Sequence, residues 1–467
     1  MADSSGDRSA ILARAGSRLA DFCERWFPDA FVFALAAVVV VFAAGLALGE
    51  GPKKLVTEFG GGFWSLVPFT MQMALVILGG FVVASSPPIA RLIAAIAGLP
   101  RTPRAAIGFV AFFAMATSLL SWGLSLIFTG LLVRELTRRV DGLDYRAVSA
   151  AAYLGLGSVW AFGLSSSAAL LQATPSAIPK ALLPVTGVLP LSETIFLWQS
   201  LATAAVLITL SVAVAVASCP SAPKAKTVAE YGIEFEPIVS RRSAAPPSTP
   251  GERLESSPVL PIAVALLMVA YLGFEVREKG GIAALDLNNF NIAFLAAGML
   301  LHASPRSFLH AVSDAVPATA GVLIQFPFYA GIFGLISKTV IAPSLARAFV
   351  AISTKGTFPL LVAVYSAALG LFVPSGGGKW VIEAPYVMAA ANAWKVHLGW
   401  TVQIYNAAEA LPNLINPFWM LPLMGLLRIR ARELAGYSVL QLVFHVPTVL
   451  FLCWLFAKTL PYMPPHL

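Results

Sequence analysis

The chain of 467 residues carries little charge, because only 12% of its residues are Asp, Glu, Lys or Arg while 58% are hydrophobic. Soluble globular proteins carry about twice that charged fraction. A water-soluble enzyme and a long disordered protein are therefore both excluded. The sequence also lacks the glycine loop with Lys and Ser or Thr that binds nucleotide phosphates, which argues against transport driven by ATP.

Cysteine and histidine are scarce as well. The three cysteines, Cys23, Cys219 and Cys453, are far apart and odd in number, and the five histidines show no ligand spacing. A disulfide framework, a metal site and a bound cofactor are therefore not expected. The net charge of +8 does not indicate nucleic-acid binding, because the basic residues lie between apolar segments, where they set membrane orientation.

Long apolar segments without charge dominate the chain. Each is long enough, at about 1.5 Å per residue, to cross a hydrocarbon layer of about 30 Å. An outer-membrane barrel would instead show strands of about ten residues with alternating polarity. We therefore predict an all-α polytopic membrane protein with about nine spans and two re-entrant hairpins. The predicted spans cover residues 30–49, 68–86, 147–179, 194–218, 258–274, 287–302, 316–336, 400–427 and 436–457.

The basic residues predict the orientation of these spans. The arginines of segment 1–29 alternate with apolar residues, which indicates an amphipathic arm on the cytoplasmic face. Residues 105–133 lack charge, yet arginines flank them on both sides, so both ends are expected at the cytoplasmic face. We therefore predict that 103–140 forms a hairpin of two half-helices that enters and leaves on the same side. The C-terminal tail, 459–467, is then expected outside.

A linker divides the chain nearly in half. Residues 219–257 hold several Pro and Ser and mixed charges, which is typical of a loop between two units. This linker is expected on the cytoplasmic face, because the span 194–218 that precedes it returns inside. We predict that the first unit covers 30–218 and the second 287–458, with one additional span and its loop, 258–286, between them. Because that single extra span reverses the direction in which the second unit starts, the two units are expected to be inverted repeats.

The spacing of polar residues supports such a repeat. In the first unit Ser121 follows Gln72 by 49 residues, and in the second unit Ser375 follows Gln325 by 50. The second unit is therefore expected to contain a hairpin and an interrupted helix of its own. The predicted segments are the hairpins 103–140 and 357–394 and the broken helices 147–180 and 400–427.

Four clusters of helix-breaking and small polar residues interrupt these segments. Half-helices that begin at such breaks present free N–H groups and a positive dipole end to an anion, whereas hydroxyl, amide and carbonyl oxygens can hold a cation. Small residues can also serve only to let helices pack closely, and that alternative stays open for any one cluster. The candidate substrate-binding residues are Ser121, Gly123, Ser165, Ser166, Ser167, Ser375, Gly376, Gly377, Gly378, Lys379, Asn413 and Asn416.

Charged side chains inside the predicted membrane segments suggest coupling to an ion. Lys379 follows three glycines and can meet a substrate carboxylate, pair with Glu383 one turn along, or reach the interface. Glu409 lies in a broken helix, where an acid is either a proton or cation site or the partner of a neighbouring helix. The candidate coupling-ion residues are Glu409, Ser125 and Asn413, and the ion is expected to be Na⁺ or H⁺.

Several segments resemble the bacterial short-chain fatty acid transporter family. The stretch Val373-Pro374-Ser375-Gly376-Gly377-Gly378 is the most specific of them, and the likeness extends from about residue 20 to 458. The other segments are Phe63-Trp64, Met71-Gln72-Met73-Ala74-Leu75, Ala173-Thr174-Pro175, Gln325-Phe326-Pro327-Phe328-Tyr329-Ala330-Gly331, Trp380-Val381-Ile382 and Pro417-Phe418-Trp419.

This resemblance implies a function and an architecture. The protein is expected to move short-chain carboxylates such as acetoacetate or butyrate across the bacterial inner membrane by cation-coupled symport. The family is grouped with ion transporters built from a scaffold and a moving transport domain, usually as homodimers in the lipid bilayer. A carboxylate uniporter or exchanger and an anion channel remain alternatives. Gradient-driven accumulation separates them, because a channel cannot concentrate its substrate.

Overall fold

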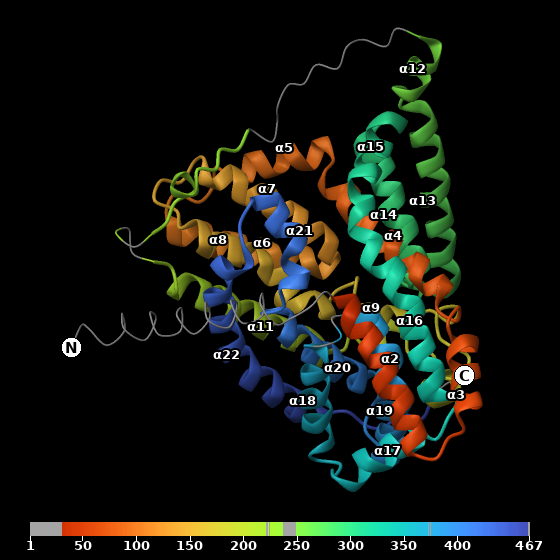
Figure 1. The fold of residues 1–467 in the computed structure, drawn as a ribbon. Coiled ribbons are helices and arrows are strands. Elements are labelled where there is room, and N and C mark those ends of the chain that lie inside the picture. Colours follow the sequence, from red (N-terminus) through yellow and green to blue (C-terminus); the bar gives the residue numbers. More distant parts are fainter. Residues whose placement is uncertain are drawn as a thin grey trace, which may run out of the picture.

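The computed structural model describes residues 30–220, 223, 225–236, 249–371, 373 and 375–465, and every regular element in these ranges is a helix (Figure 1). The prediction of an all-α protein is confirmed for this part of the chain. Several sequence expectations fall elsewhere: the N-terminal arm 1–29, the linker residues 221, 222, 224 and 237–248, Pro374, and residues 466–467 of the tail lie outside the described residues.

Seven helical segments of the described chain are long and apolar enough to cross a membrane, and four further apolar segments are shorter. The number differs from the nine expected spans for local reasons. The apolar stretch Ala34–Ala47 of the expected span 30–49 counts among the shorter segments, and the helix at 287–302 has only 16 residues. The expected span 400–427 is divided near residue 415, whereas residues 103–120 qualify by length although they form half of a hairpin. The seven segments are Val67–Ala84, Pro103–Leu120, Tyr145–Ala173, Trp198–Ala217, Pro250–Lys279, Pro305–Ser337 and Ala431–Ala457.

The first half folds around a hairpin that turns at Ser121. The Ser121 hydroxyl accepts a hydrogen bond from the Leu124 N–H at 3.4 Å and so caps the second arm, while the two arms pack along each other. The helices of this half are α2 (Ala30–Ala47), α3 (Pro52–Gly62), α4 (Val67–Ala84), α5 (Pro87–Ile96), α6 (Pro103–Leu120), α7 (Trp122–Thr137), α8 (Tyr145–Leu154), α9 (Ser167–Ala173), α10 (Leu183–Thr186) and α11 (Trp198–Ala217).

The second half contains a hairpin with a matching turn at Ser375. Its hydroxyl accepts a hydrogen bond from the Gly378 N–H at 3.2 Å and caps the second arm in the same way. The helices of this half are α12 (Pro250–Glu255), α13 (Val259–Lys279), α14 (Leu287–His302), α15 (Pro305–Ala315), α16 (Ala320–Ser337), α17 (Ile341–Ala351), α18 (Phe358–Gly370), α19 (Gly376–Trp394), α20 (Leu398–Asn413), α21 (Pro417–Leu427) and α22 (Ala431–Ala457).

The helices of the two halves follow one another in the same order. α4 and α5 precede the α6–α7 hairpin, and α16 and α17 precede the α18–α19 hairpin. Each hairpin is followed by a divided helix, α8 with α9 in the first half and α20 with α21 in the second, and then by one long helix, α11 or α22. α13 is the extra helix between the halves and lies at the edge of the molecule (Figure 1). Its side chains are mostly exposed.

The described part of the linker marks one end of the molecule. The Lys226 N–H donates to Asp144 at the start of α8, and the Tyr231 hydroxyl donates to Glu433 at the start of α22, each at 2.9 Å. The far end of α22 leads to Tyr462, whose hydroxyl donates to Asn392 near the end of α19 at 2.9 Å. Because α22 separates these two groups of contacts, the first hairpin opens toward the linker end and the second toward the opposite end.

Candidate functional site

Both hairpin turns meet the interrupted helix of the first half inside the molecule. The Trp122 N–H, at the start of α7, donates to the Ser165 hydroxyl at 3.0 Å. On the other side, a Cβ atom at Gly377 of α19 would lie 3.1 Å from the Ser167 Cβ. The glycine therefore allows the second turn to approach the start of α9 at backbone distance. Three of the four predicted breaks thus converge.

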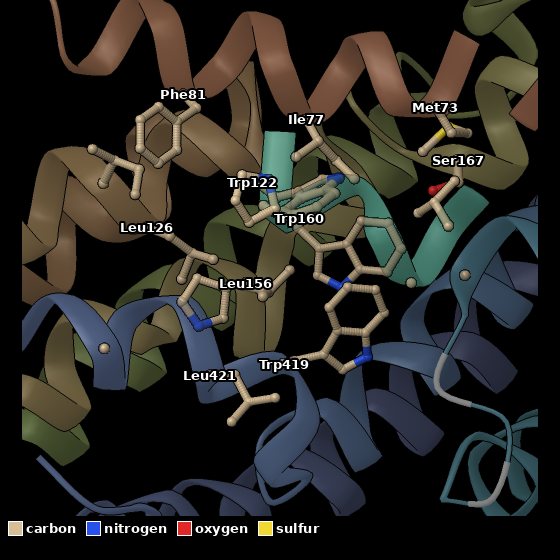
Figure 2. Close-up of a pocket in the computed structure, with 18 of the residues that line it drawn as sticks. Met73, Ile77, Phe81, Trp122, Leu126, Leu156, Trp160, Ser167, Trp419 and Leu421 are labelled. Carbon is tan, nitrogen blue, oxygen red and sulfur yellow. The ribbon is translucent and has the colours of Figure 1, made fainter. Parts of the chain in front are cut away.

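A cavity of about 690 Å³ lies between these turns and the helices α4 and α16 (Figure 2). Its wall is largely apolar, with Met73 and Ile77 from α4 and the indole rings of Trp122, Trp160 and Trp419. Polar side chains are few in this lining. They are Ser85, Ser167, Asp314, Gln325 and Ser375. A small ligand with one polar end and an apolar remainder suits such a lining.

The cavity extends from the hairpin turns to the linker end of the molecule. Its lining includes Ser85 at the end of α4 and Asp314 at the end of α15, and the Asp314 side chain is 59% exposed. Gly98, which follows α5, lies beside Arg139 at the end of α7, so this end of α4 is the linker end. The cavity is therefore accessible from the side on which the linker lies.

Only some of the candidate substrate residues line this cavity. Ser167, Ser375, Gly376 and Gly377 do so. Other candidates hold the surrounding segments together: besides Ser165, the Ser166 hydroxyl accepts a hydrogen bond from the Asn406 amide of α20 at 3.0 Å. The substrate role of every candidate stays a prediction.

The glycines and Ser121 lie where helices come close. Gly123 faces Ile77 of α4, and the ring of Tyr329 in α16 occupies the place where a side chain at Gly378 would lie, 2.4 Å from the position of a Cβ atom. The Ser121 hydroxyl is fully buried in its capping role. These positions stiffen the hairpin turns against α4 and α16.

The candidates of the second broken helix lie apart from the cavity lining. Asn413 is fully buried, its carbonyl oxygen accepts a hydrogen bond from the Tyr153 hydroxyl at 2.6 Å, and its side-chain amide has no hydrogen-bond partner among the described residues. Asn416 is half-buried in the connection between α20 and α21. Ser125, a coupling-ion candidate, donates its hydroxyl proton to the Ala114 carbonyl at 2.7 Å.

Lys379 and Glu409 meet in a buried cluster of charges. The Lys379 ammonium lies 2.5 Å from Glu409 and 3.2 Å from Glu383, and it donates to the Ser366 carbonyl at 2.6 Å. All three charged side chains are 0% exposed. Lys379 therefore points between α18, α19 and α20, and its ammonium is not part of the cavity lining among the described residues. Of the three roles considered for Lys379 from the sequence, the structure contains its pairing with Glu383.

Trp160 is a cavity residue that sequence reasoning missed. It lies in a short 3-10 turn, Trp160–Phe162, which follows a π-helical turn, Gly155–Val159, and so belongs to the break itself. Its ring fills the place of a side chain at Gly376, and its indole N–H has no hydrogen-bond partner among the described residues. The sequence did contain a signal for it, since Trp160 lies among the glycines of a predicted helix break. Such breaks often contain π-helical turns, which are frequent at functional sites.

Two hairpins and broken helices that surround a cavity within a single chain are typical of transporter folds. The solved structure of the YdaH transporter of Alcanivorax borkumensis is similar, with a TM-score of 0.58 and 16% identity over 92% of this chain and 98% of that one. MtrF of Neisseria gonorrhoeae, described with a class of antimetabolite efflux pumps, has a TM-score of 0.57 and 13% identity over 97% of this chain and 100% of that one. At these identities the likeness shows the fold alone.

Sequence relatives identify the family. A candidate short-chain fatty acid transporter of Escherichia coli K12 is 33% identical over 435 residues, 93% of this chain and 97% of the relative. A protein of the same description in Haemophilus influenzae is 31% identical over 448 residues, 94% of this chain and 98% of the relative. Residues 11–456 match the family model for short chain fatty acid transporters. This chain belongs to that family, and the resemblance seen in its motifs is confirmed.

Proposed function

We propose that this protein transports short-chain carboxylates, such as acetoacetate and butyrate, across the bacterial inner membrane by cation-coupled symport. The observation that carries the proposal is the cavity at the start of α19, where a few polar groups face an apolar wall. A four-carbon acid has the same division, with a carboxylate at one end and a short hydrocarbon or keto chain at the other. Membership of the family supports the same substrate class.

The start of α19 provides the anion-binding part of the proposed site. Gly376 and Gly377 line the cavity, and their backbone N–H groups have no hydrogen-bond acceptor among the described residues, so these two N–H groups are the donors proposed for the ligand. A helix N-terminus stabilises an anion by about 0.3–1 kcal/mol at an exposed position and by more where water is excluded. The hydroxyls of Ser167 and Ser375 and the amide of Gln325 complete the polar set. The hydrocarbon end of the acid then packs on the indole rings.

Release on the opposite side requires the hairpins to move relative to α4 and α16. The cavity reaches the linker end in this structure, and its wall is shared between the hairpin turns and these two helices. We therefore propose an elevator-like movement in which 103–180 and 357–428 travel together and the helices α2, α4, α14 and α16 stay in place. The static helices are also the proposed contact surface of a homodimer.

Transport by the purified protein in lipid vesicles tests this function. Labelled acetoacetate is offered under an imposed Na⁺ gradient or pH gradient, and initial rates in protein-free vesicles are subtracted because undissociated acids cross bilayers. The expected result is saturable uptake that rises above equilibrium under one of the two gradients. Uptake that only equilibrates assigns a uniporter or exchanger instead, and flux that does not saturate assigns a channel.

A further inference from the structure

The cluster formed by Lys379, Glu383 and Glu409 has more negative than positive charge. Two carboxylates face one ammonium, and all three side chains are fully buried between α18, α19 and α20. The other titratable groups that face the cluster are the phenols Tyr329 of α16, Tyr365 of α18, Tyr386 of α19 and Tyr405 of α20. None of these groups supplies a second positive charge. One negative charge is thus left without compensation where burying it is expensive.

One carboxylate oxygen of the cluster is open to a proton. Glu383 accepts a hydrogen bond from the Ser366 hydroxyl at Oε2, at 2.5 Å, and its Oε1 faces the Lys379 ammonium at 3.2 Å, so each of its oxygens has a donor or a cation beside it. Glu409 faces Lys379 through Oε2, whereas its Oε1 has no hydrogen-bond partner among the described residues although it is fully buried. A proton added at Glu409 Oε1 therefore breaks no hydrogen bond and removes the uncompensated charge.

The first half of the chain builds the same junction without any charge. Lys379, Glu383 and Glu409 follow the turn serine, Ser375, by 4, 8 and 34 residues, and the same offsets from Ser121 lead to three small neutral residues. These residues are Ser125, Thr129 and Gly155.

That neutral junction is closed by hydroxyls and close packing. The Ser125 hydroxyl donates to the Ala114 carbonyl at 2.7 Å, and the Thr129 hydroxyl donates to the Ser125 carbonyl at 2.6 Å. A Cβ atom at Gly155 would lie only 2.5 Å from the Ser125 hydroxyl oxygen, so no side chain fits there. A hairpin of this type therefore packs well without ions, and packing alone does not explain the charged cluster of the second half.

The Lys379 ammonium also determines which ion the cluster can take. It is surrounded by two carboxylates and the Ser366 carbonyl, which are the ligand types that a hard metal cation would use. While the ammonium is held there, a sodium ion has no vacant place among these oxygens. A proton needs only a free oxygen lone pair.

We propose that the Lys379–Glu383–Glu409 cluster is the coupling site of the transporter and that it binds one proton, on Glu409, for each carboxylate carried. This inference rests on the proposed function and specifies its coupling ion. Lys379 is in the first turn of α19, the same turn whose glycines line the cavity. A substrate anion there is repelled by the unprotonated cluster, with its net negative charge, and accepted by the neutral, protonated one. Binding of the anion and of the proton are therefore linked.

Proton counting on the purified full-length protein tests the proposal. Binding of acetoacetate is followed by the fluorescence of the cavity tryptophans in weakly buffered detergent solution, with a pH indicator present. The expected result is uptake of about one proton per bound anion above the titration range of the cluster, and an apparent Kd that rises about tenfold per pH unit there. Addition of Na⁺ should leave that Kd unchanged.

Variants locate the proton. Glu409→Gln keeps the shape of the side chain but cannot gain a proton, so it should abolish proton uptake and flatten the pH dependence of binding. Glu135→Gln is the matched control, because Glu135 is also buried in a hairpin arm but pairs with Arg138 and Arg139, at 3.3 and 3.1 Å, at the linker end. This control should keep the proton uptake of the unmodified protein.

The outcomes separate the two proposals. Binding of acetoacetate without proton uptake, or binding that requires Na⁺, overturns the proton site while the transport function stands. Proton uptake that persists in Glu409→Gln overturns the assignment to this cluster. If neither acetoacetate nor butyrate binds to the unmodified protein, the proposed function itself fails. If Glu409→Gln does not bind the anion, the proton count of the unmodified protein still decides between H⁺ and Na⁺. The location of the proton is then decided by the same measurement on two other variants, which are Glu383→Gln and the triple variant Lys379→Ser, Glu383→Thr, Glu409→Gly.

Discussion

The Ser375 hydroxyl both caps α19 and lies in the cavity wall, and one substitution removes both contributions. It accepts the Gly378 N–H at 3.2 Å at the start of α19, and it lies in the cavity wall. Ser375→Val removes the cap, at a cost of about 1 kcal/mol, and places a methyl group at the turn. We expect carboxylate uptake to fall about tenfold or more, with the protein still inserted and folded. Initial rates in vesicles of matched protein content measure the change, and Ser375→Thr, which keeps the hydroxyl, is the control. Normal uptake by the valine variant would remove Ser375 from the site.

Gly377 allows the close approach of three segments, and a methyl group there tests how much that approach matters. A Cβ atom at Gly377 would lie 2.6 Å from the Phe69 ring of α4, besides its contact with Ser167. We expect Gly377→Ala to shift the start of α19 and to reduce uptake several-fold, because overpacking costs about 1–3 kcal/mol.

The matched control is Gly273→Ala in α13, where no atom lies within 4 Å of the added methyl group. It should transport normally and be slightly more stable to heat, since alanine favours a helix. Equal behaviour of the two variants in vesicle uptake would show that the approach at Gly377 is not needed.

At this scale the sequence offered the Lys379–Glu383 pair as one alternative, but it could not name Lys379 as the partner of Glu409. Lys379 and Glu383 are four residues apart, and helix periodicity alone places them on one face. Glu409 contacts Lys379 from α20. This contact could not be predicted, because the periodicity of one helix does not indicate which face of another helix packs against it. The same reason explains why Ser165 and Ser166 were expected around a substrate although their hydroxyls contact Trp122 and Asn406.

At the scale of elements, the first hairpin could be predicted because charge and helix breakers constrain it together, and the second because the spacing of the first half repeats in the second. Segment 103–140 has arginines at both ends and a serine turn in the middle, and the structure has α6 and α7 with the turn at Ser121. The π-helical turn at Gly155–Val159 could not be predicted. It depends on the close packing of Gly155 against the Ala114 carbonyl, which exists only in the folded chain.

A disulfide between a hairpin and a scaffold helix tests which elements move. A Cβ atom at Gly123 of α7 would lie 3.8 Å from the Ile77 Cα of α4, so cysteines at these two positions are close enough to be joined. With the three native cysteines replaced by serine, we expect oxidation of the Ile77→Cys, Gly123→Cys pair to stop transport and reduction to restore it.

The control for this experiment joins two static helices. A Cβ atom at Gly79 of α4 would lie 2.8 Å from the Phe294 Cβ of α14, so cysteines at these two positions are within reach of each other, and the pair Gly79→Cys, Phe294→Cys should keep transport after oxidation. If the oxidised Ile77–Gly123 pair transports as fast as its reduced form, α4 and the first hairpin move as one body, and the elevator-like movement is wrong.

At the scale of the whole molecule, a regular spacing predicted the repeat because inverted units must place corresponding turns at corresponding depths. The offset from Gln72 to Ser121 nearly equals that from Gln325 to Ser375, and the helices of the two halves do follow the same order. The position of the cavity was beyond the sequence. It depends on how far the hairpins lie from α4 and α16 in this conformation, and a transporter changes that distance during its cycle.

Accessibility of single cysteines tests the orientation of the whole molecule and of its cavity at once. Gly321 of α16 lines the cavity in its linker half, while Gly60 of α3 is exposed, with no atom within 4 Å of an added Cβ, at the opposite end. That end of α3 is fixed by Glu58, which pairs with Lys338 at 3.3 Å where α16 terminates. Because the arginines that flank the first hairpin place the linker end in the cytoplasm, we predict that an impermeant thiol reagent modifies Gly321→Cys only from the cytoplasmic side and Gly60→Cys only from outside. Acetoacetate should slow the reaction at Gly321→Cys about tenfold at saturation by filling the cavity, and it should leave Gly60→Cys unaffected.

Labelling is compared between intact cells and inverted vesicles in a background in which the three native cysteines are serine. Reaction of both cysteines from one side would overturn the predicted topology, and a Gly321→Cys reaction that acetoacetate does not slow would separate this cavity from the substrate.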